Sequence, residues 1–211
     1  IAVFAGRSDD PESQTADART LHAALRAQRY DGKLWFLDIR TSGTLGDLAQ
    51  SRADLAIIAL PPEDALAALE LAGRIGCRSA LVLGSGIGPG HASELKRIAR
   101  REALHLLGPN SLGFQRPRLH LNASVIGPLA GAGPLALVSQ SGALTSSMLD
   151  WAAANAVGFS LVASLGRGTA VDIAQVLDFL AHDGETQSIV VYLEGIAAAR
   201  PFMSALRSAA I

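Results

Sequence analysis

The alternation of short apolar runs with longer segments of helical period constrains the fold of this chain more than any other feature. In the first half, the apolar runs predict strands at 1–5, 34–37, 55–59, 79–83 and 104–107. The segments between them that have a helical period occupy 15–29, 62–75 and 91–102. Strands that are joined by crossover helices form parallel sheets, because a parallel neighbour needs a long return connection. The sequence therefore predicts an α/β fold with mainly parallel sheets.

The pattern is interrupted once, between residues 108 and 133, where glycine, proline, asparagine and serine are frequent. Such a segment is typical of a connection between domains. After it the alternation resumes, with strands predicted at 135–138, 160–164 and 188–192 and helices at 142–155, 171–182 and 199–209. We therefore expect a first domain over 1–113, a connection over 114–132 and a second domain over 133–211.

The second domain contains few predicted strands, and both ends of the sequence fall inside a pattern. Ile1 opens a predicted strand, and Ile211 follows an alternation that gives no stop signal. A sheet of only three strands is small. We therefore expect this chain to be a fragment and the sheet to gain strands from a longer protein.

Composition excludes several classes of function. The chain has 211 residues, of which 49% are apolar and 18% charged, and a net charge of −1, which indicates a core-forming protein. With 18 basic and 19 acidic residues, two Trp and two Tyr, it lacks the basic surface that nucleic acid requires. The long uncharged stretch 119–149 is broken by Pro128 and Pro134, so we expect no membrane span. The single cysteine, Cys77, excludes an internal disulfide and favours the cytoplasm.

One turn has the composition of an anion site. A predicted strand runs into Ser139-Gln140-Ser141-Gly142 and then into a predicted helix. Backbone N–H groups at a helix start attract anions, and the two hydroxyls add further donors. Ser141 also fits a simple N-cap. The residues alone leave both interpretations open.

The first predicted strand is followed by Gly6-Arg7-Ser8, where nucleotide-binding α/β sheets place a phosphate turn. The complete Gly-x-Gly-x-x-Gly pattern is missing, and acidic residues follow the turn. Asp38, after the second strand, matches the acid that binds the ribose of NAD. An NAD(P)-binding protein is therefore one alternative. No histidine and cysteine spacing predicts a metal site.

A succession of motifs resembles one family of enzymes. They are Leu-Gly-Pro-Asn-Ser-Leu-Gly at 107–113, Leu-Asn-Ala-Ser at 121–124, Ser-Gln-Ser-Gly-Ala-Leu at 139–144, Leu-Asp-Trp-Ala at 149–152, Gly-Phe-Ser at 158–160, Asp-Phe-Leu-Ala-His-Asp at 178–183 and Tyr-Leu-Glu-Gly at 192–195. In this order they resemble the NDP-forming acyl-CoA synthetases, relatives of the succinyl-CoA synthetase α subunit. The motifs at 121–124 and 149–152 look most like the synthetase-like region of bacterial protein-lysine acetyltransferases.

The resemblance implies a Rossmann-like CoA-binding domain followed by a truncated flavodoxin-like domain. It also implies a role for residues in each of them. It places Gly6, Arg7 and Ser8 near the phosphates of CoA. It places Gly84, Ser85 and Gly86 beside the pantetheine, and Pro109, Asn110 and Ser111 toward the thiol. In the second domain, Ser141 and Gly142 would cradle the phosphoryl group of a phosphohistidine, and Glu194 would orient its imidazole.

The reaction that the resemblance implies converts acyl-CoA, phosphate and NDP into acid, CoA and NTP, through an acyl phosphate and a phosphohistidine. ADP or ATP would bind to an ATP-grasp domain or subunit of the parent protein, not to this segment alone, and a homo-oligomer is compatible with the family. The phosphorylated histidine of the family lies beyond this chain. We expect the fragment alone to be inactive. A non-catalytic acyl-CoA-sensing region of an acetyltransferase is the main alternative.

Two departures from the family pattern concern the CoA site. Arg7 and the acidic residues Asp9, Asp10 and Glu12 stand where relatives have a Gly-Ala-Ser turn with further small residues. The second strand ends in Leu-Asp-Ile-Arg at 37–40, where relatives have an Asn-Pro pair. Both changes bear on how tightly the first domain holds CoA.

Overall fold

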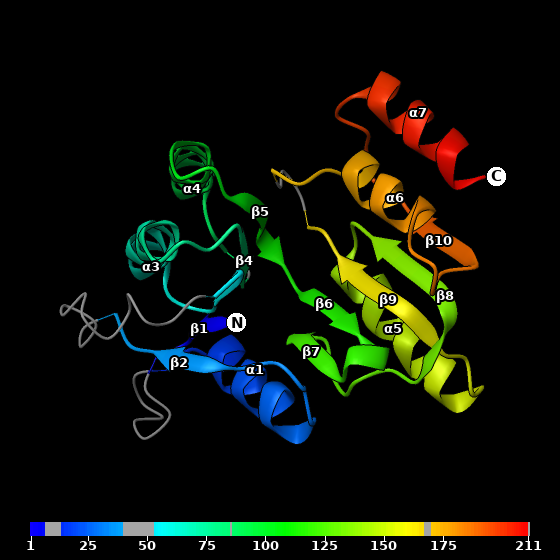
Figure 1. Ribbon diagram of the computed structural model, residues 1–211, viewed down its shortest axis with the longest axis horizontal. Helices are drawn as coiled ribbons and strands as arrows, with labels where there is room; N and C mark the ends of the chain where they lie inside the picture. The colour runs from blue at the N-terminus through cyan, green and yellow to red at the C-terminus, as the bar shows by residue number, and fades with distance from the viewer. Residues whose placement is uncertain (7–13, 40–52, 85, 167–169, 211) are drawn as a thin grey trace.

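The computed structural model describes residues 1–6, 14–39, 53–84, 86–166 and 170–210. Within them the chain forms two five-stranded sheets, with helices on both faces of each (Figure 1). The predicted α/β class with mainly parallel sheets is confirmed.

The first sheet, which we call sheet A, is entirely parallel. Its order is β2-β1-β3-β4-β5. The strands are β1 (Ala2–Phe4), β2 (Trp35–Leu37), β3 (Leu55–Ile58), β4 (Ser79–Leu83) and β5 (His105–Ser111). Helices separate β1 from β2, β3 from β4 and β4 from β5 in the chain, as the sequence predicted.

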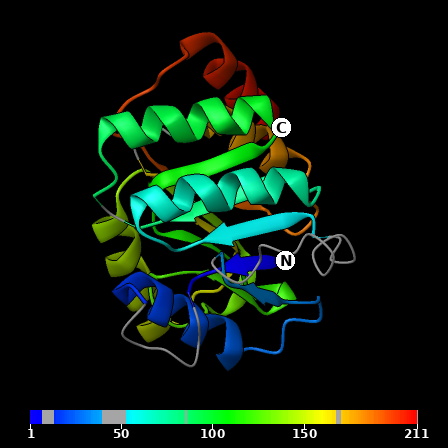
Figure 2. The ribbon, with the colours of Figure 1, turned by 90° about the vertical axis from the view of Figure 1, so that its left-hand side faces the viewer.

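Helices cover both faces of sheet A. Helix α1 (Ala16–Ala27) lies on one face, and helices α3 (Pro62–Arg74) and α4 (Pro89–Arg101) lie side by side on the other (Figure 2). Thr15 caps α1 by accepting a hydrogen bond from the N–H of Ala18. The other two helices begin with proline, which suits the first helical position because its missing N–H would have no partner there.

The segment 114–132, in which the sequence analysis placed no strand, contributes two strands to the second sheet. After β5 the chain passes directly into β6 (Gly113–Arg116), a short 3₁₀ helix η2 (Pro117–Leu119) and β7 (Leu121–Ser124). Both strands pair antiparallel. Their inward positions are largely polar, with Gln115, Asn122 and Ser124 buried, so the apolar alternation that announces a strand is absent.

The second sheet, which we call sheet B, has the order β10-β8-β9-β6-β7. Strands β8 (Ala132–Ser139), β9 (Phe159–Ser164) and β10 (Ser188–Tyr192) are parallel to one another. Helix α5 (Gly142–Ala154) packs on one face, and α6 (Ile173–Ala181) with α7 (Ala199–Ala209) packs on the other. The sheet therefore has five strands within this chain, against the three that were expected, because the connection supplies two.

Apolar contacts join the two sheets. Leu121 and Ala123 of β7 pack with Leu21 of α1 and with the face of sheet A that α1 covers. Leu107 and Phe114 contact the cores of both sheets. No helix within the described residues is long and apolar enough to cross a membrane.

Candidate functional site

The carboxyl ends of the parallel strands in sheets A and B meet at a junction built from residues 108–113. Gly166, which follows β9 with a φ of 70°, passes so close to β5 that a Cβ there would lie 2.2 Å from the carbonyl oxygen of Asn110. A Cβ on Gly142, the first residue of α5, would lie 2.5 Å from Cδ1 of Leu112. The predicted thiol-end residues and the predicted anion cradle are therefore neighbours, although about thirty residues separate them along the chain.

Asn110 fixes the loop that follows β4. The residue adopts a left-handed conformation, with a φ of 60°. Its side-chain oxygen accepts a hydrogen bond from the N–H of Ile87, and its amide nitrogen donates to the carbonyl of Ile87, both at 3.2 Å. This loop contains Gly84 and Gly86, whose φ values of 110° and 86° favour glycine. Their backbone is free of Cβ atoms that would keep a ligand away.

Ser111 is buried between the sheets. Its hydroxyl donates to the carbonyl of Ser164 at 2.5 Å and accepts from the N–H of Gly113 at 2.9 Å, and the residue is 0% exposed. Pro109 is also buried. Ser111, which we expected near the thiol of CoA, therefore also holds the two sheets together. The sequence did not reveal this second role.

The turn before α5 is fixed by side-chain hydrogen bonds. The buried Ser139 hydroxyl accepts from the N–H of Ser141 at 3.0 Å and donates to its carbonyl at 2.9 Å. Ser141 caps the helix by accepting from the N–H of Leu144 at 3.4 Å, and the Thr145 hydroxyl donates to the Ser141 carbonyl. The capping interpretation is thus confirmed. A helix start has further N–H groups without intrahelical partners, so the cap and an anion cradle are compatible.

Gln140 ties this turn to the end of β10, and the sequence analysis did not single it out. Its side-chain oxygen accepts from the N–H groups of Glu194 at 2.7 Å and Gly195 at 3.0 Å. Its amide nitrogen donates to the Gly195 carbonyl at 3.0 Å. The exposed Glu194 therefore lies at the same edge of sheet B as Ser141 and Gly142. A partner 54 residues away leaves no local signal, so only the pairing of β10 with β8 reveals this contact.

The turn after β1 is described only at its start. Gly6 has a φ of 71°. Arg7, Ser8 and Ser85 lie outside the described residues. Across the same edge, a Cβ on Gly84 would lie 3.3 Å from a carboxylate oxygen of Asp17 in the first turn of α1. This acid therefore places a negative charge beside the loop that follows β4.

His22 of α1 is buried beneath this edge of the sheet. It is 6% exposed and stacks on Phe36, with ring centroids 4.8 Å apart. Neither ring nitrogen makes a well-formed hydrogen bond in the described part of the chain, although the backbone of Gly6 and Ala5 lies close to the ring. Burial lowers the pKa of His22 below its usual value, and the charge of Arg26 lowers it further. The imidazole is therefore neutral near pH 7.

Cys77 is 5% exposed, as expected of a structural cysteine, and burial raises the pKa of its thiol to about 11. The described residues hold no cluster of His, Cys, Asp or Glu that could bind a metal ion.

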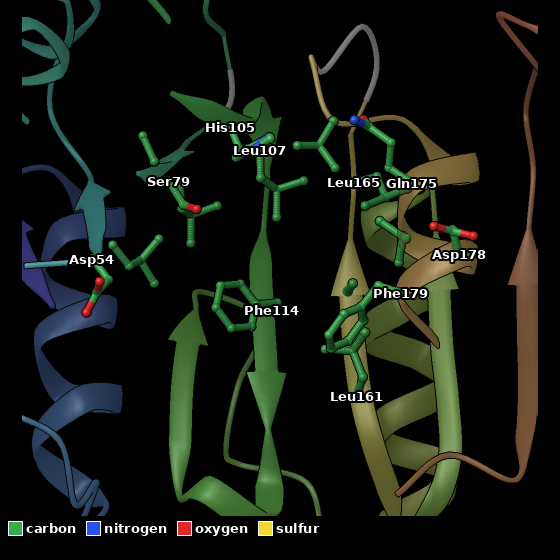
Figure 3. A pocket seen from close by; sticks show the side chains of 16 residues that line it. Asp54, Ser79, His105, Leu107, Phe114, Leu161, Leu165, Gln175, Asp178 and Phe179 are labelled. Carbon is green, nitrogen blue, oxygen red and sulfur yellow. The ribbon is translucent and has the colours of Figure 1, made fainter. Parts of the chain in front are cut away.

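A cavity of about 750 Å³ lies between the sheets, and on the sheet B side it is lined as far as Leu165 at the carboxyl end of β9. It opens beside the amino ends of β3, β4 and β5, where Asp54, Ser79 and His105 line it (Figure 3). Leu107 and Phe114 face Phe179 of α6 across it. This cavity therefore belongs to the amino edge of sheet A, whereas the predicted ligand residues lie at the carboxyl edge.

Comparison with known proteins identifies the family. Residues 132–211 match the model of the succinyl-CoA ligase like flavodoxin domain. An ADP-forming acetate–CoA ligase I of Archaeoglobus fulgidus is 36% identical over 163 residues, which are 74% of this chain. The chain belongs to the NDP-forming acyl-CoA synthetase family. The resemblance found in the sequence is thereby confirmed.

Other members of the family agree in sequence and fold. The α subunit of an ADP-forming acetate–CoA ligase I of Pyrococcus furiosus is 36% identical over 71% of this chain. A dinucleotide-forming acetyl-coenzyme A synthetase 1 of Candidatus Korarchaeum cryptofilum has the same fold, with a TM-score of 0.86 and 28% identity over 98% of this chain. The same synthetase has been solved in complex with phosphate and ADP.

This chain is shorter than the proteins that it matches. It spans 24% of the Archaeoglobus ligase, 34% of the Pyrococcus subunit and 48% of the Korarchaeum chain. It therefore corresponds to part of such a ligase or of its subunit.

Proposed function

We propose that this chain forms the CoA-binding and phosphoryl-transfer part of an NDP-forming acyl-CoA synthetase. The observation that carries the proposal is the junction at 108–113, which brings Asn110 of sheet A against Gly166 and Leu112 against the start of α5. A reaction that passes phosphate between a thioester and a histidine needs these two edges side by side. The domain boundaries that we propose are 1–113 and 133–211, joined by 114–132.

In the first step, an oxygen of inorganic phosphate attacks the thioester carbonyl. The C–S bond breaks, the CoA thiolate leaves, and acyl phosphate forms. We assign CoA to the carboxyl edge of sheet A, where glycine turns let its backbone approach the ligand. The residues assigned to CoA are Gly6, Arg7, Ser8, Gly84, Ser85, Gly86 and Pro109, with Asn110 and Ser111 at the thiol end.

In the second step, a histidine outside this chain attacks the phosphorus of acyl phosphate, the acid leaves as carboxylate, and a phosphohistidine forms. Ser141 and Gly142 provide the start of α5 for the phosphoryl group, whose charge the helix dipole favours. Glu194, held at the same edge, accepts a hydrogen bond from the imidazole and keeps it oriented. An ATP-grasp domain or subunit then supplies NDP, which takes the phosphoryl group. We assign this reaction to the cytoplasm.

Isothermal titration of the full-length protein that carries this chain tests the assignment of the first domain. We expect heat on addition of CoA and acetyl-CoA, and acyl-CoA formation from acid, CoA and ATP in a coupled assay. Binding of NAD without any response to CoA would overturn the assignment in favour of the NAD(P)-binding alternative.

A ligand-sensing region of a protein-lysine acetyltransferase is a second candidate, because the motifs at 121–124 and 149–152 are those that pointed to it. The structure gives the first motif a structural role, since the side chains of Asn122 and Ser124 are buried and bonded to each other. Acetyl-CoA binding by the full-length protein without turnover and without labelling by [γ-³²P]ATP would favour this candidate.

A further inference from the structure

Gln140 occupies the one position between the two serines of the turn, at the point where two parallel strands end together. Strand β10 pairs with β8 so that Tyr192 lies opposite Ser139. The N–H of Gln140 extends this ladder by donating to the Tyr192 carbonyl at 3.1 Å. The Gln140 side chain is therefore directed by the sheet toward the residues that follow β10.

The Gln140 side-chain amide forms hydrogen bonds with the backbone of the turn after β10, as the backbone of a neighbouring strand would. It receives two N–H groups, from Glu194 and Gly195, and gives one N–H to the Gly195 carbonyl. Glu194, Gly195 and Ile196 are all exposed, and no atom lies within 4 Å of a Cβ built on Gly195. Apolar packing is therefore slight at this turn, and the three hydrogen bonds to Gln140 contribute directly to its geometry.

The same peptide unit also sets the start of α5. The Ser139 hydroxyl accepts a hydrogen bond from the N–H of Ser141 and donates one to its carbonyl, and Ser141 is the cap of the helix. Gln140 lies between them in the chain, so its backbone is fixed on both sides. A movement of Glu194 relative to the helix start would have to break bonds to Gln140.

We infer that Gln140 is a positioning residue, which holds the backbone of Glu194, and through it the root of its side chain, at a set distance from the anion-binding start of α5. The inference rests on the proposed function, since it concerns the histidine that would lie between these two groups. Gln140 itself touches neither the phosphoryl group nor the imidazole. Its effect on the reaction comes through the position of Glu194, because misplacement of a catalytic group by about 1 Å costs on the order of 100-fold in rate.

The test replaces Gln140 in the full-length protein with methionine, which has a similar length and no amide. Gln187→Met is the matched control, because Gln187 is exposed at the opposite, amino end of β10. We measure acyl-CoA synthesis, the melting temperature, and hydrogen–deuterium exchange of the peptide that contains Glu194 and Gly195.

We expect Gln140→Met to lower kcat by roughly tenfold to a hundredfold. The KM for CoA should stay unchanged, because the contacts of Asn110 with Ile87 are intact. Exchange should rise only in the peptide around Glu194, with the melting temperature preserved. The control should match the wild type in all three measurements.

Gln140→Asn is the second variant, in case Gln140→Met does not fold. It keeps a polar amide at the exposed edge but is one carbon too short to bridge the turn, so the same loss of kcat is expected. An active wild type whose kcat is unchanged by either substitution overturns the inference and leaves the proposed function standing. A loss that appears equally in kcat, KM and melting temperature also overturns it. A wild type without synthetase activity overturns the proposed function itself, and the inference with it.

Discussion

Sheets A and B have the same number of strands but are held together by different interactions. In sheet A the buried faces are largely apolar, and the buried polar side chains among its described residues are His22 of α1 and Ser111 at the very end of β5. In sheet B and the crossing into it, eight buried residues are polar: Ser111, Gln115, Asn122, Ser124, Ser139, Thr145, Ser160 and Ser164. Seven of them form side-chain hydrogen bonds within this unit, and the carbonyl of the eighth, Ser164, accepts from Ser111. Apolar packing tolerates small displacements, whereas hydrogen bonds lose strength steeply with geometry, so sheet B is the more sharply positioned of the two.

The carboxyl edges differ in the same sense. At the carboxyl edge of sheet A, the turns contain glycines with positive φ, namely Gly6, Gly84 and Gly86. Sheet B also has such a glycine, Gly166, but the turn after β8 and the turn after β10 are fixed by the side chains of Ser139 and Gln140. A long ligand that lies along backbone needs the first kind of edge, and a small, highly charged group needs the second. The two edges therefore suit the two substrates that the proposed function assigns to them.

The amino edges give the largest expected difference between the sheets. Arg116 of sheet B contacts Asp183 at 2.8 Å, with side chains only 14% and 9% exposed. Arg78 of sheet A contacts Asp54 at 2.9 Å, with side chains 79% and 83% exposed. Removal of Arg116 would leave the part-buried carboxylate of Asp183 without its cation, so Arg116→Met should lower the free energy of unfolding by roughly 1–3 kcal/mol. Urea unfolding measures this loss.

Arg78→Met is the control, and its unfolding midpoint should hardly move, because exposed pairs contribute little. The pH dependence gives a second measurement. A hydrogen bond from Arg116 holds the pKa of Asp183 below its usual value of 3.8. This contribution is therefore present above that value and is lost as the pH falls through the lower, folded-state pKa. Equal losses in both variants would mean that the sheets do not differ in this way.

The junction between the sheets gives an effect of similar size. Gly166→Ala would place a methyl group 2.2 Å from the Asn110 carbonyl oxygen, at a φ of 70°. Backbone must move to relieve this contact, and we expect a loss of about 2 kcal/mol in the free energy of unfolding. Because the movement separates Asn110 from the α5 edge, synthetase activity should fall further than stability does.

Gly184→Ala is the matched control for this substitution, since no atom lies within 4 Å of its Cβ position. Thermal unfolding and the coupled activity assay compare the two variants. Full activity in Gly166→Ala would show that the close approach of the sheets is not needed for the reaction.

The elements that the sequence predicted correctly are those whose signal is local. The helices over 15–29 and 62–75 were found because their apolar residues recur with a helical period, and the helix over 142–155 because Ser141 and Gly142 mark its start. Strands β6 and β7 were missed because Gln115, Asn122 and Ser124 put polar groups where a buried strand usually has apolar ones. Only the partners of these groups, such as the Pro128 carbonyl that accepts from Gln115, make that burial favourable.

In the candidate site, too, only the residues with a local sequence signal could be predicted. Ser141 was recognisable because a capping serine and its helix are adjacent in sequence. Gln140 and the structural role of Ser111 were not, since their partners lie 54 and 53 residues further along the chain. Contacts at such separations depend on strand order, which no local pattern encodes.

The two helix caps test whether the edges differ in function as well as in structure. Thr15 caps α1 of sheet A, and Ser141 caps α5 of sheet B. Replacement of either by alanine should lower the free energy of unfolding by about 1 kcal/mol. Only Ser141→Ala should also reduce phosphohistidine labelling by [γ-³²P]ATP, because only this cap lies at the proposed phosphoryl site. Equal labelling in both variants would remove the cradle role from Ser141 and leave it as a cap.

His22 gives the smallest expected effect, and it concerns the buried imidazole in the apolar core of sheet A. Burial lowers its pKa from the usual 6.5, so below that pH the unfolded chain binds a proton that the folded chain excludes. The free energy of unfolding should therefore decrease between pH 7 and pH 5. His22→Leu should show a smaller decrease, because leucine can pack on Phe36 but does not titrate. His182→Leu is the control, because His182 is exposed and bonded to the Asp178 carbonyl. Urea unfolding at both pH values measures the difference, and the same pH dependence in wild type and His22→Leu would show that this imidazole does not exclude its proton. Such a result would mean that the core of sheet A accommodates a buried charge as readily as the hydrogen-bonded interior of sheet B.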